Sequence, residues 1–332
     1  GRKVMAPKAK AVKPCKVPSL ALFQKVVGSK AALHKLDVCM DSMNAFHVSL
    51  IGLENALEVS FAGANDRAFV QELAQRYTGT ADIGHLSASA EMPDVQGVTY
   101  DAARLLSSLE YVAQAMSRDI TRYNLVGVCF KGSELCATDG HRLHLVTDLP
   151  EVPRTNSGIL SADAVTTLIR AIKSSKPETV TMRQDEFYFW FDMAGVNISI
   201  CLRSRAIDRR FPDYHQAIPT PCERTSILSG ETDELVAALE RAPVIVGIAK
   251  KYRCLAFSSE GSFAVSKDKK DKVRLPLEGA VVTVSEIHLD NACLMEALDG
   301  IGRSVAVHAI DDLAPVLFRS GDRLAIVMPM RR

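Results

Sequence analysis

From Val98 onward, the hydrophobic and polar positions of the chain repeat one arrangement four times. A short extended run leads into an amphipathic helix, and three extended runs follow it. The helices are predicted at 100–117, 161–175, 231–243 and 288–301. Within the first of them, apolar residues recur at helical spacing. The pattern therefore predicts four helix-plus-strands units, each of roughly 60 residues.

Several local signals set the limits of these elements. Ser161 is a good N-cap for the second helix, and Pro243 is expected to end the third. The steps 131–133 and 320–322 are typical of hairpin turns. Before Val98, the residues 17–33 and 68–77 have helical patterns, and 39–52 and 55–63 have strand patterns.

One unit alone cannot cover both its helix and its sheet, so two units are expected to pair into each domain. The fold class is therefore α+β. We predict four segments: a basic flexible tail at 1–16, a shortened N-terminal domain at 17–97, a middle domain at 98–220 and a C-terminal domain at 221–332.

Composition limits the kinds of function that need considering. The 332 residues carry 40 basic and 39 acidic side chains, for a net charge of +1, so the whole surface does not grip nucleic acid by charge. This balance is compatible with a local basic surface that binds nucleic acid. No run approaches the ~20 apolar residues of a membrane span, and the basic, proline-interrupted start is no signal peptide. Met5 is a candidate natural start. A cytoplasmic protein is expected.

The eight cysteines form no C-x-x-C pair and no Cys/His cluster with zinc spacing. Several of them lie in apolar runs, where a reduced thiol behaves as a small hydrophobic side chain. Reduced cysteines, no metal and no cofactor are therefore expected.

Three motifs are the most specific strings in the chain. They are A-T-D-G-H-R-L at 137–143, R-F-P-D-Y at 210–214 running on to Ile218-Pro219, and V-M-P-M-R at 327–331. In this order and at the boundaries of the repeats, they resemble the bacterial sliding clamp family, the β subunit of DNA polymerase III. The resemblance covers 98–332 and leaves the abbreviated N-terminal region less well matched.

The resemblance implies a DNA-clamp fold, with sheets outside and helices lining a central hole that surrounds duplex DNA. Non-specific electrostatic contacts let such a ring slide. The implied DNA-binding positions are Arg104, Arg118, Arg122, Tyr123, Arg170 and Lys173. Tyr123 is a candidate for stacking on a base. For any single helix position, an ordinary solvated surface is an alternative interpretation.

The resemblance also implies a peptide-binding pocket between the middle and last domains. It would receive short segments of the replicative polymerase, the clamp loader and other proteins. Its wall would comprise Leu125, Thr138, Gly140, His141, Arg142, Leu143, Pro212, Ala217, Ile326, Met328, Pro329 and Met330. A methionine-rich cleft repacks around different apolar peptides, and Arg142 and Arg331 are expected to fix the peptide's polar ends. Ala217, His288, Asn291 and Pro315 depart from the family pattern, so an altered peptide preference is expected.

The family's rings are head-to-tail dimers, and the resemblance places Val244 and Ile245 at the contact between subunits. One alternative is a clamp-like adaptor, a phage, plasmid or paralogous form, that binds peptides without closing a ring.

Catalysis is the remaining alternative, since His141 lies near Asp139. No nucleophile accompanies this pair, and Asp139 is expected to cap the turn instead. The acidic pairs Asp268 with Asp271 and Asp311 with Asp312 are expected in solvated loops.

Overall fold

The computed structural model describes 35–40, 46–51, 55–61 and 95–330, apart from 153–157, 186, 196–197, 221, 223, 247–252, 267 and 281–285. For 35–61 it describes the backbone strands alone. The predicted tail at 1–16, the helices predicted at 17–33 and 68–77, and Arg331 lie outside the described residues.

The four predicted units are present. The first is β4 (Val98–Asp101), α3 (Ala102–Ala113), β5 (Gly127–Lys131), β6 (Glu134–Thr138) and β7 (Arg142–Val146). The second is β8 (Gly158–Ser161), α4 (Ala162–Ser175), β9 (Thr179–Gln184), β10 (Tyr188–Gly195) and β11 (Ile198–Arg205). The third is β12 (Ser226–Glu231), α5 (Thr232–Val246), β13 (Arg253–Ser258), β14 (Gly261–Val265), β15 (Lys272–Arg274) and the short β16 (Glu278–Ala280). The fourth is β17 (Ile287–Leu289), α6 (Asn291–Leu298), β18 (Ser304–Ala309), β19 (Val316–Ser320) and β20 (Arg323–Val327).

The units form three antiparallel sheets, and one of these sheets also includes the N-terminal strands β1 (Lys35–Met40), β2 (Phe46–Ile51) and β3 (Asn55–Phe61). The seven-stranded sheet has the order β1-β2-β3-β11-β10-β9-β4, and the nine-stranded sheet has the order β16-β12-β18-β19-β20-β7-β6-β5-β8. The third has the order β15-β14-β13-β17. Two sheets therefore run across the predicted domain limits, and the limits themselves stay a prediction.

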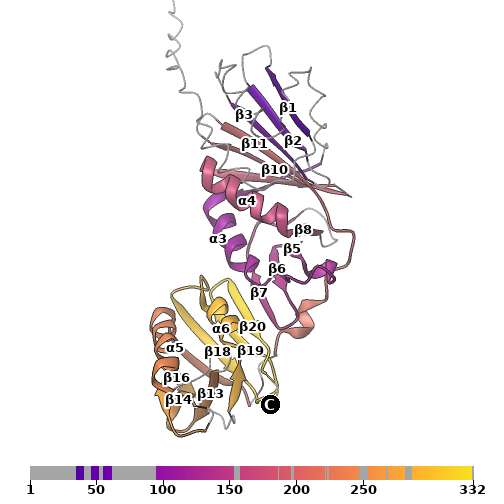
Figure 1. Cartoon of the computed structure of the whole chain (residues 1–332). Coiled ribbons are helices and arrows are strands. Elements are labelled where there is room, and N and C mark those ends of the chain that lie inside the picture. Colours follow the sequence, from indigo (N-terminus) through magenta and orange to yellow (C-terminus); the bar gives the residue numbers. More distant parts are fainter. Residues whose placement is uncertain are drawn as a thin grey trace, which may run out of the picture.

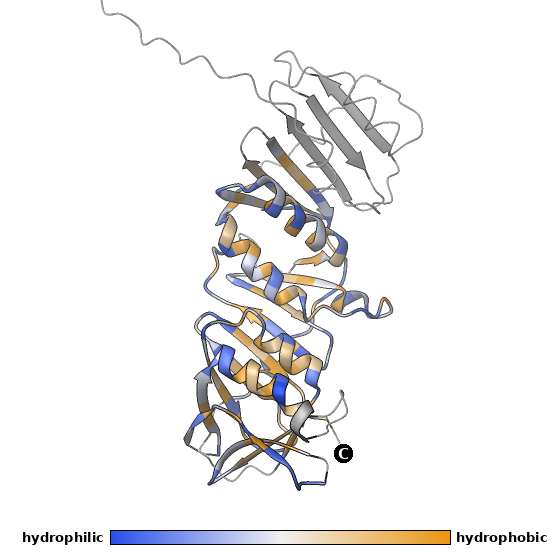
Figure 2. Ribbon diagram, turned by 60° about the vertical axis from the view of Figure 1, so that its left-hand side comes forward, coloured by the Kyte–Doolittle hydropathy of each residue, from blue (hydrophilic) through white to orange (hydrophobic). Residues whose placement is uncertain are grey.

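The elements follow one another along an elongated molecule (Figure 1). The strands β1 to β3 lie at one end, and α5 with the four-stranded sheet lies at the other. The four described helices are stacked along one side of the sheets, as the turned view shows (Figure 2). Among the described residues, no helix is long and apolar enough to cross a membrane.

Local sequence explains where the helices begin. Asp101, Ser161 and Asp290 are N-caps whose side chains accept hydrogen bonds from backbone N–H groups of the first turn, which confirms the predicted role of Ser161. Asp290 also shortens the fourth helix, which was predicted from His288. His288 and Leu289 are in β17 instead, because they pair with β13.

The predicted end of the third helix at Pro243 is wrong, since α5 continues to Val246. A proline removes its own N–H and crowds the carbonyl four residues earlier. Here Pro243 lies within the last turn of α5, and only three helical residues follow it.

The nine-stranded sheet buries different apolar residues on its two faces, as strand alternation requires. On β7, Val146 joins the main core beneath the helices, whereas Leu143 and Leu145 join a second cluster on the outer face. That outer cluster comprises Leu125, Cys129, Cys136, Leu143, Leu145, Ile159, Phe211, Tyr214, Leu317, Leu324 and Ile326. The described part of the peptide site predicted from the sequence lies over this face.

Candidate functional site

The centre of the candidate site is the pairing of β7 with β20, which joins the middle and C-terminal segments. Leu143 lies opposite Ile326 across this pair and opposite Thr138 on β6. The backbone N–H of Met328 donates to the carbonyl oxygen of His141 at 2.8 Å, so the pairing continues beyond the end of β20. Residues separated by more than 180 positions therefore share one continuous apolar floor.

A turn between β6 and β7 forms one edge of this floor. The Oδ1 atom of Asp139 accepts hydrogen bonds from the backbone N–H groups of His141 and Arg142 at 2.9 and 3.0 Å. Gly140 has a φ of +89°, a backbone conformation that favours glycine. Asp139 thus caps the turn as predicted. This structural role explains why an aspartate lies close to His141.

The role of Arg142 at a peptide's polar end stays a prediction, and the structure gives this side chain other partners. Its side chain is only 8% exposed and lies on the helix face of the sheet, because Arg142 and Leu143 are neighbours on one strand. The guanidinium forms ion pairs with Asp139 and with Glu296 of α6, and it donates to the carbonyl oxygen of Gln114 at 2.7 Å. Arg142 therefore ties α3, the turn and α6 together.

The segment from Phe211 through the short 3-10 helix η2 (Tyr214–Ala217) covers part of the outer cluster. Phe211 and Tyr214 are buried there, with their rings 6.0 Å apart in an edge-on arrangement. The Tyr214 hydroxyl donates to Glu134 at 2.5 Å. Burial, followed by this hydrogen bond, raises the pKa of Tyr214 well above its ordinary value. The R-F-P-D-Y motif thus anchors the segment by its two aromatic rings.

The remaining predicted residues divide into a buried floor and an exposed rim. Leu125, Thr138, Leu143 and Ile326 are buried. Gly140, His141, Pro212, Ala217 and Met328 are exposed, while Pro329 and Met330 are half-buried. Met328 is one of the few large hydrophobic side chains described as exposed, at 39%. The structure brings apolar residues of both segments to one surface that a peptide can reach.

The predicted DNA-facing residues lie on or after the helices α3 and α4. Arg118, Arg122 and Tyr123 are exposed in and beside the short helix η1 (Tyr123–Leu125), and Arg170 is exposed on α4. Several of the cations have acidic or carbonyl partners. Arg104 contacts Asp322 at 3.2 Å, Lys173 contacts Glu110 at 2.5 Å, and Arg122 donates to the carbonyl oxygen of Asp139 at 3.0 Å.

Two arginines next to Tyr123 were not assigned a role from the sequence. Arg209 and Arg210 line an open hollow of about 270 Å³ together with Thr121, Tyr123 and Asn124. The Asn124 side chain donates to the carbonyl oxygen of Arg210 at 3.4 Å, which holds the two chain segments together. The available signal in the sequence was the pair of arginines formed by Arg209 and the first residue of the R-F-P-D-Y motif, Arg210.

Other predicted positions have plain structural roles or are not described. Asp268 and Asp311 accept hydrogen bonds from nearby groups within their own loops, as predicted for solvated turns. Val244 and Ile245 lie within α5, and their side chains are outside the described residues, so their place at a subunit contact stays a prediction.

The fold defined by these sheets and helices is that of the DNA polymerase III β subunit. The β subunit from Thermotoga maritima is 19% identical with a TM-score of 0.69, covering 94% of this chain and 95% of that one. A DnaN sliding clamp from Pseudomonas aeruginosa bound to griselimycin is 16% identical with a TM-score of 0.74, covering 94% and 96%.

Sequence comparison agrees with the structural comparison. The chain is 29% identical over 195 residues to the beta sliding clamp of Synechococcus elongatus, covering 54% of this chain and 50% of that protein. It is 26% identical over 217 residues to the beta sliding clamp of Caulobacter vibrioides, covering 61% and 55%. No protein-family model matches the chain. The chain is thus similar in sequence to bacterial beta sliding clamps, and the matches span about half the length of these curated relatives.

Proposed function

We propose that the chain is a processivity factor for a DNA polymerase. It encircles duplex DNA in the cytoplasm and carries out no reaction itself. It holds the replicative polymerase, the clamp loader and other partners through short peptides that bind over the β7–β20 junction. The observation that carries the proposal is the apolar floor of Leu143 and Ile326 beside the exposed Met328.

The chemistry of this surface suits apolar peptides. The floor is buried and fixed by strand pairing, so a peptide meets a prearranged surface. The rim carries flexible methionine side chains, which adapt to leucine and phenylalanine side chains of different partners. Arg209 and Arg210 lie beside the covering segment and suit an acidic group of the same peptide or a DNA phosphate.

The helix side of the molecule supports a sliding contact with DNA. Exposed arginines and a lysine stand on α3, α4 and the segment after α3, while the net charge of the chain is only +1. Acidic partners near Arg104 and Lys173 weaken any single phosphate contact. Weak, sequence-independent contacts permit movement along DNA, and topology rather than affinity then retains the protein.

A head-to-tail dimer would close the ring. The strands β1 to β3 and the four-stranded sheet lie at opposite ends of the elongated molecule (Figure 1). This placement suits a contact between unlike ends, which closes into a ring only when the rotation between subunits allows it. Val244 and Ile245 remain the proposed apolar residues of that contact.

Peptide binding is tested by fluorescence anisotropy with a labelled clamp-binding peptide that carries leucine and phenylalanine. We expect Met328→Ala and Met330→Ala together to weaken binding about tenfold, which corresponds to about 1.4 kcal/mol. The matched control is Ile227→Ala, since Ile227 is also an exposed apolar residue but lies on β12, away from the junction. Unchanged affinity in the double variant would refute the peptide site.

Ring formation is tested separately by solution mass and by retention on nicked circular DNA, before and after linearisation. A dimer that stays on the circle and leaves the linear form supports the ring. A monomer that binds the peptide and is never retained on circular DNA would instead identify a clamp-like adaptor.

A further inference from the structure

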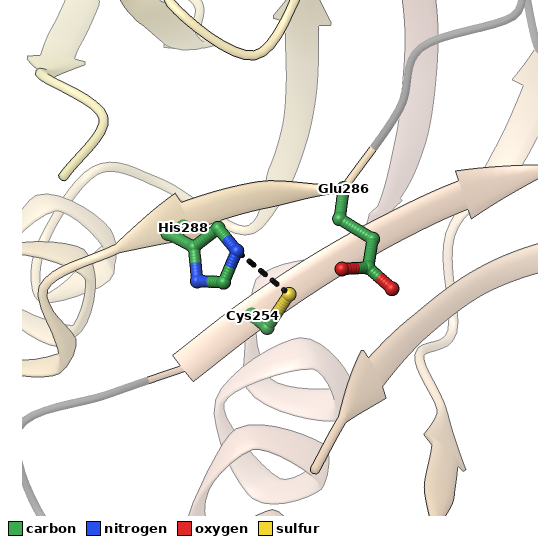
Figure 3. Close-up of side chains that lie close together, drawn as sticks. All are labelled: Cys254, Glu286 and His288. Carbon is green, nitrogen blue, oxygen red and sulfur yellow. Dashed lines mark hydrogen bonds between the residues drawn. The ribbon is translucent and has the colours of Figure 1, made fainter. Parts of the chain in front are cut away.

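Three side chains with metal-binding atoms meet on the four-stranded sheet, outside the site described above. They are Cys254 on β13, His288 on β17 and Glu286 just before β17 (Figure 3). Cys254 and His288 lie directly opposite each other in the pairing of β13 with β17, and the Cys254 Sγ and His288 Nε2 atoms are 3.6 Å apart. The three ligand atoms all lie within 4.8 Å of one another.

We propose that Cys254, Glu286 and His288 bind one zinc ion, with a water molecule as the fourth ligand. Zinc prefers a thiolate, an imidazole and a carboxylate in tetrahedral geometry. Zinc bonds of about 2.3 Å to sulfur and about 2.0 Å to nitrogen, at a tetrahedral angle, place those two atoms about 3.5 Å apart. The observed separation of 3.6 Å matches this value without movement of the strands.

The surroundings of the cluster favour a partly buried site. Cys254 is 7% exposed, and the Glu286 side chain is 19% exposed. Glu286 forms an ion pair with Lys269 at 3.2 Å, and the Lys269 side chain is 60% exposed. Zinc binding displaces this ammonium group and the thiol proton of Cys254, which passes to solvent. An ion pair with one well-exposed partner contributes little to stability, so the loss of the Lys269–Glu286 pair opposes zinc binding only weakly.

The site adjoins the C-terminal segment. The backbone N–H of Met330 donates to the carbonyl oxygen of His288 at 2.7 Å, so β17 carries a proposed zinc ligand and supports the rim of the peptide surface. A bound ion fixes β13 and β17 to each other at this point. Zinc is therefore expected to raise the melting temperature, because a ligand that binds only the folded chain stabilises it. The zinc site stands whether or not the proposed function holds.

The test is zinc titration of the chelator-treated full chain by isothermal calorimetry, with cobalt(II) absorption as a second reading. We expect one zinc per chain and a thiolate-to-cobalt charge-transfer band. Cys254→Ser and His288→Asn should each weaken zinc binding at least tenfold and remove or reduce the band. Cys222→Ser is the matched control, because Cys222 is an exposed thiol outside the cluster. Lys269→Ala should strengthen binding.

A further measurement uses only the unaltered chain and so does not depend on whether the variants fold. Zinc should protect Cys254 of the unaltered chain from alkylation and leave Cys222 reactive, as read by mass spectrometry of peptides. Less than one zinc per chain, equal binding in Cys254→Ser and the unaltered chain, or alkylation of Cys254 at the same rate with and without zinc would each overturn the proposal. Peptide affinity is measured on the same samples, so failure of the peptide site and failure of the zinc site remain distinguishable.

Discussion

Arg142 of β7 forms an ion pair with Glu296 of α6, and this contact links the middle segment of the chain to the C-terminal segment on the helix side of the shared sheet. Arg142 also pairs with Asp139 at 3.3 Å. A nearly buried guanidinium needs such partners, since an unpaired buried charge is strongly destabilising. Arg142 is therefore a structural residue that holds the two segments in register.

Replacing Glu296 by glutamine should lower the free energy of unfolding by about 1–2 kcal/mol, because Arg142 loses one of its two carboxylates in a nearly buried position. Urea unfolding measures the change. The control is Glu260→Gln, since Glu260 pairs with Lys272 at 3.7 Å and is 75% exposed, so its loss should change stability by less than about 0.5 kcal/mol. Equal effects of the two substitutions would contradict this role.

His144 should make stability depend on pH. Burial lowers the pKa of His144 to about 4, its Nδ1–H donates to the Tyr111 carbonyl oxygen at 2.9 Å, and its ring stacks on Tyr111. The unfolded chain therefore binds more protons than the folded chain between pH 6.5 and about 4. Stability is full above pH 6.5 and falls with decreasing pH through this window, by about 3 kcal/mol from this residue alone.

The measurement is urea unfolding of the unaltered chain and of His144→Gln at several pH values between 7.5 and 4. The variant lacks the titrating group, so the difference between the two proteins should shrink as the pH falls. Other histidines, including His308, are common to both proteins and cancel in the difference. A difference that stays constant with pH would show that His144 is not buried in its neutral form.

Tyr214→Phe should lower the free energy of unfolding by about 1–2 kcal/mol, since it removes a hydrogen bond to the Glu134 carboxylate while keeping the ring in the outer cluster. Tyr123→Phe is the control. Tyr123 is 65% exposed, so its hydroxyl is in contact with water and its removal should change the free energy of unfolding little. The measurement is guanidinium unfolding of both variants. A smaller loss of unfolding free energy in Tyr214→Phe than in Tyr123→Phe would contradict the prediction.

Gly140→Ala should lower the free energy of unfolding by about 1–2 kcal/mol, and by more than Gly132→Ala does. Both glycines have positive φ, at +89° and +56°. A Cβ atom at Gly140 would lie 3.1 Å from the Arg122 Nη1 atom, whereas a Cβ at Gly132 would meet nothing within 4 Å. The difference between the two melting temperatures measures the combined effect of the larger φ at Gly140 and of the contact with Arg122. Equal losses would contradict the prediction.

The repeat of helix and strands could be predicted because periodicity is a local property. Apolar spacing located α3 and α4, and Ser161 marked the start of α4, since each signal depends on residues within a few positions. The limits of α5 and α6 were predicted less well. Strand pairing with β13 decided the state of His288, and such pairing joins residues 34 positions apart.

The candidate peptide site was predicted from three motifs, and the structure brings Leu143 and Ile326 together as that prediction requires. The role of Arg142 was not predictable, because its partners Gln114 and Glu296 come from two helices far along the chain. Arg209 and Arg210 became visible as a site only when the chain brought them beside Tyr123.

The α+β class, the fourfold repeat and the apolar composition of the β7–β20 junction can be predicted from the amino-acid sequence, because they follow from short-range periodicity and from motifs. The face of the sheet that each residue occupies, and the meeting of Cys254, Glu286 and His288, follow from the pairing of strands in three dimensions. Hydrogen-bonded strand pairing and burial act between residues distant in the chain, and no local pattern records their register.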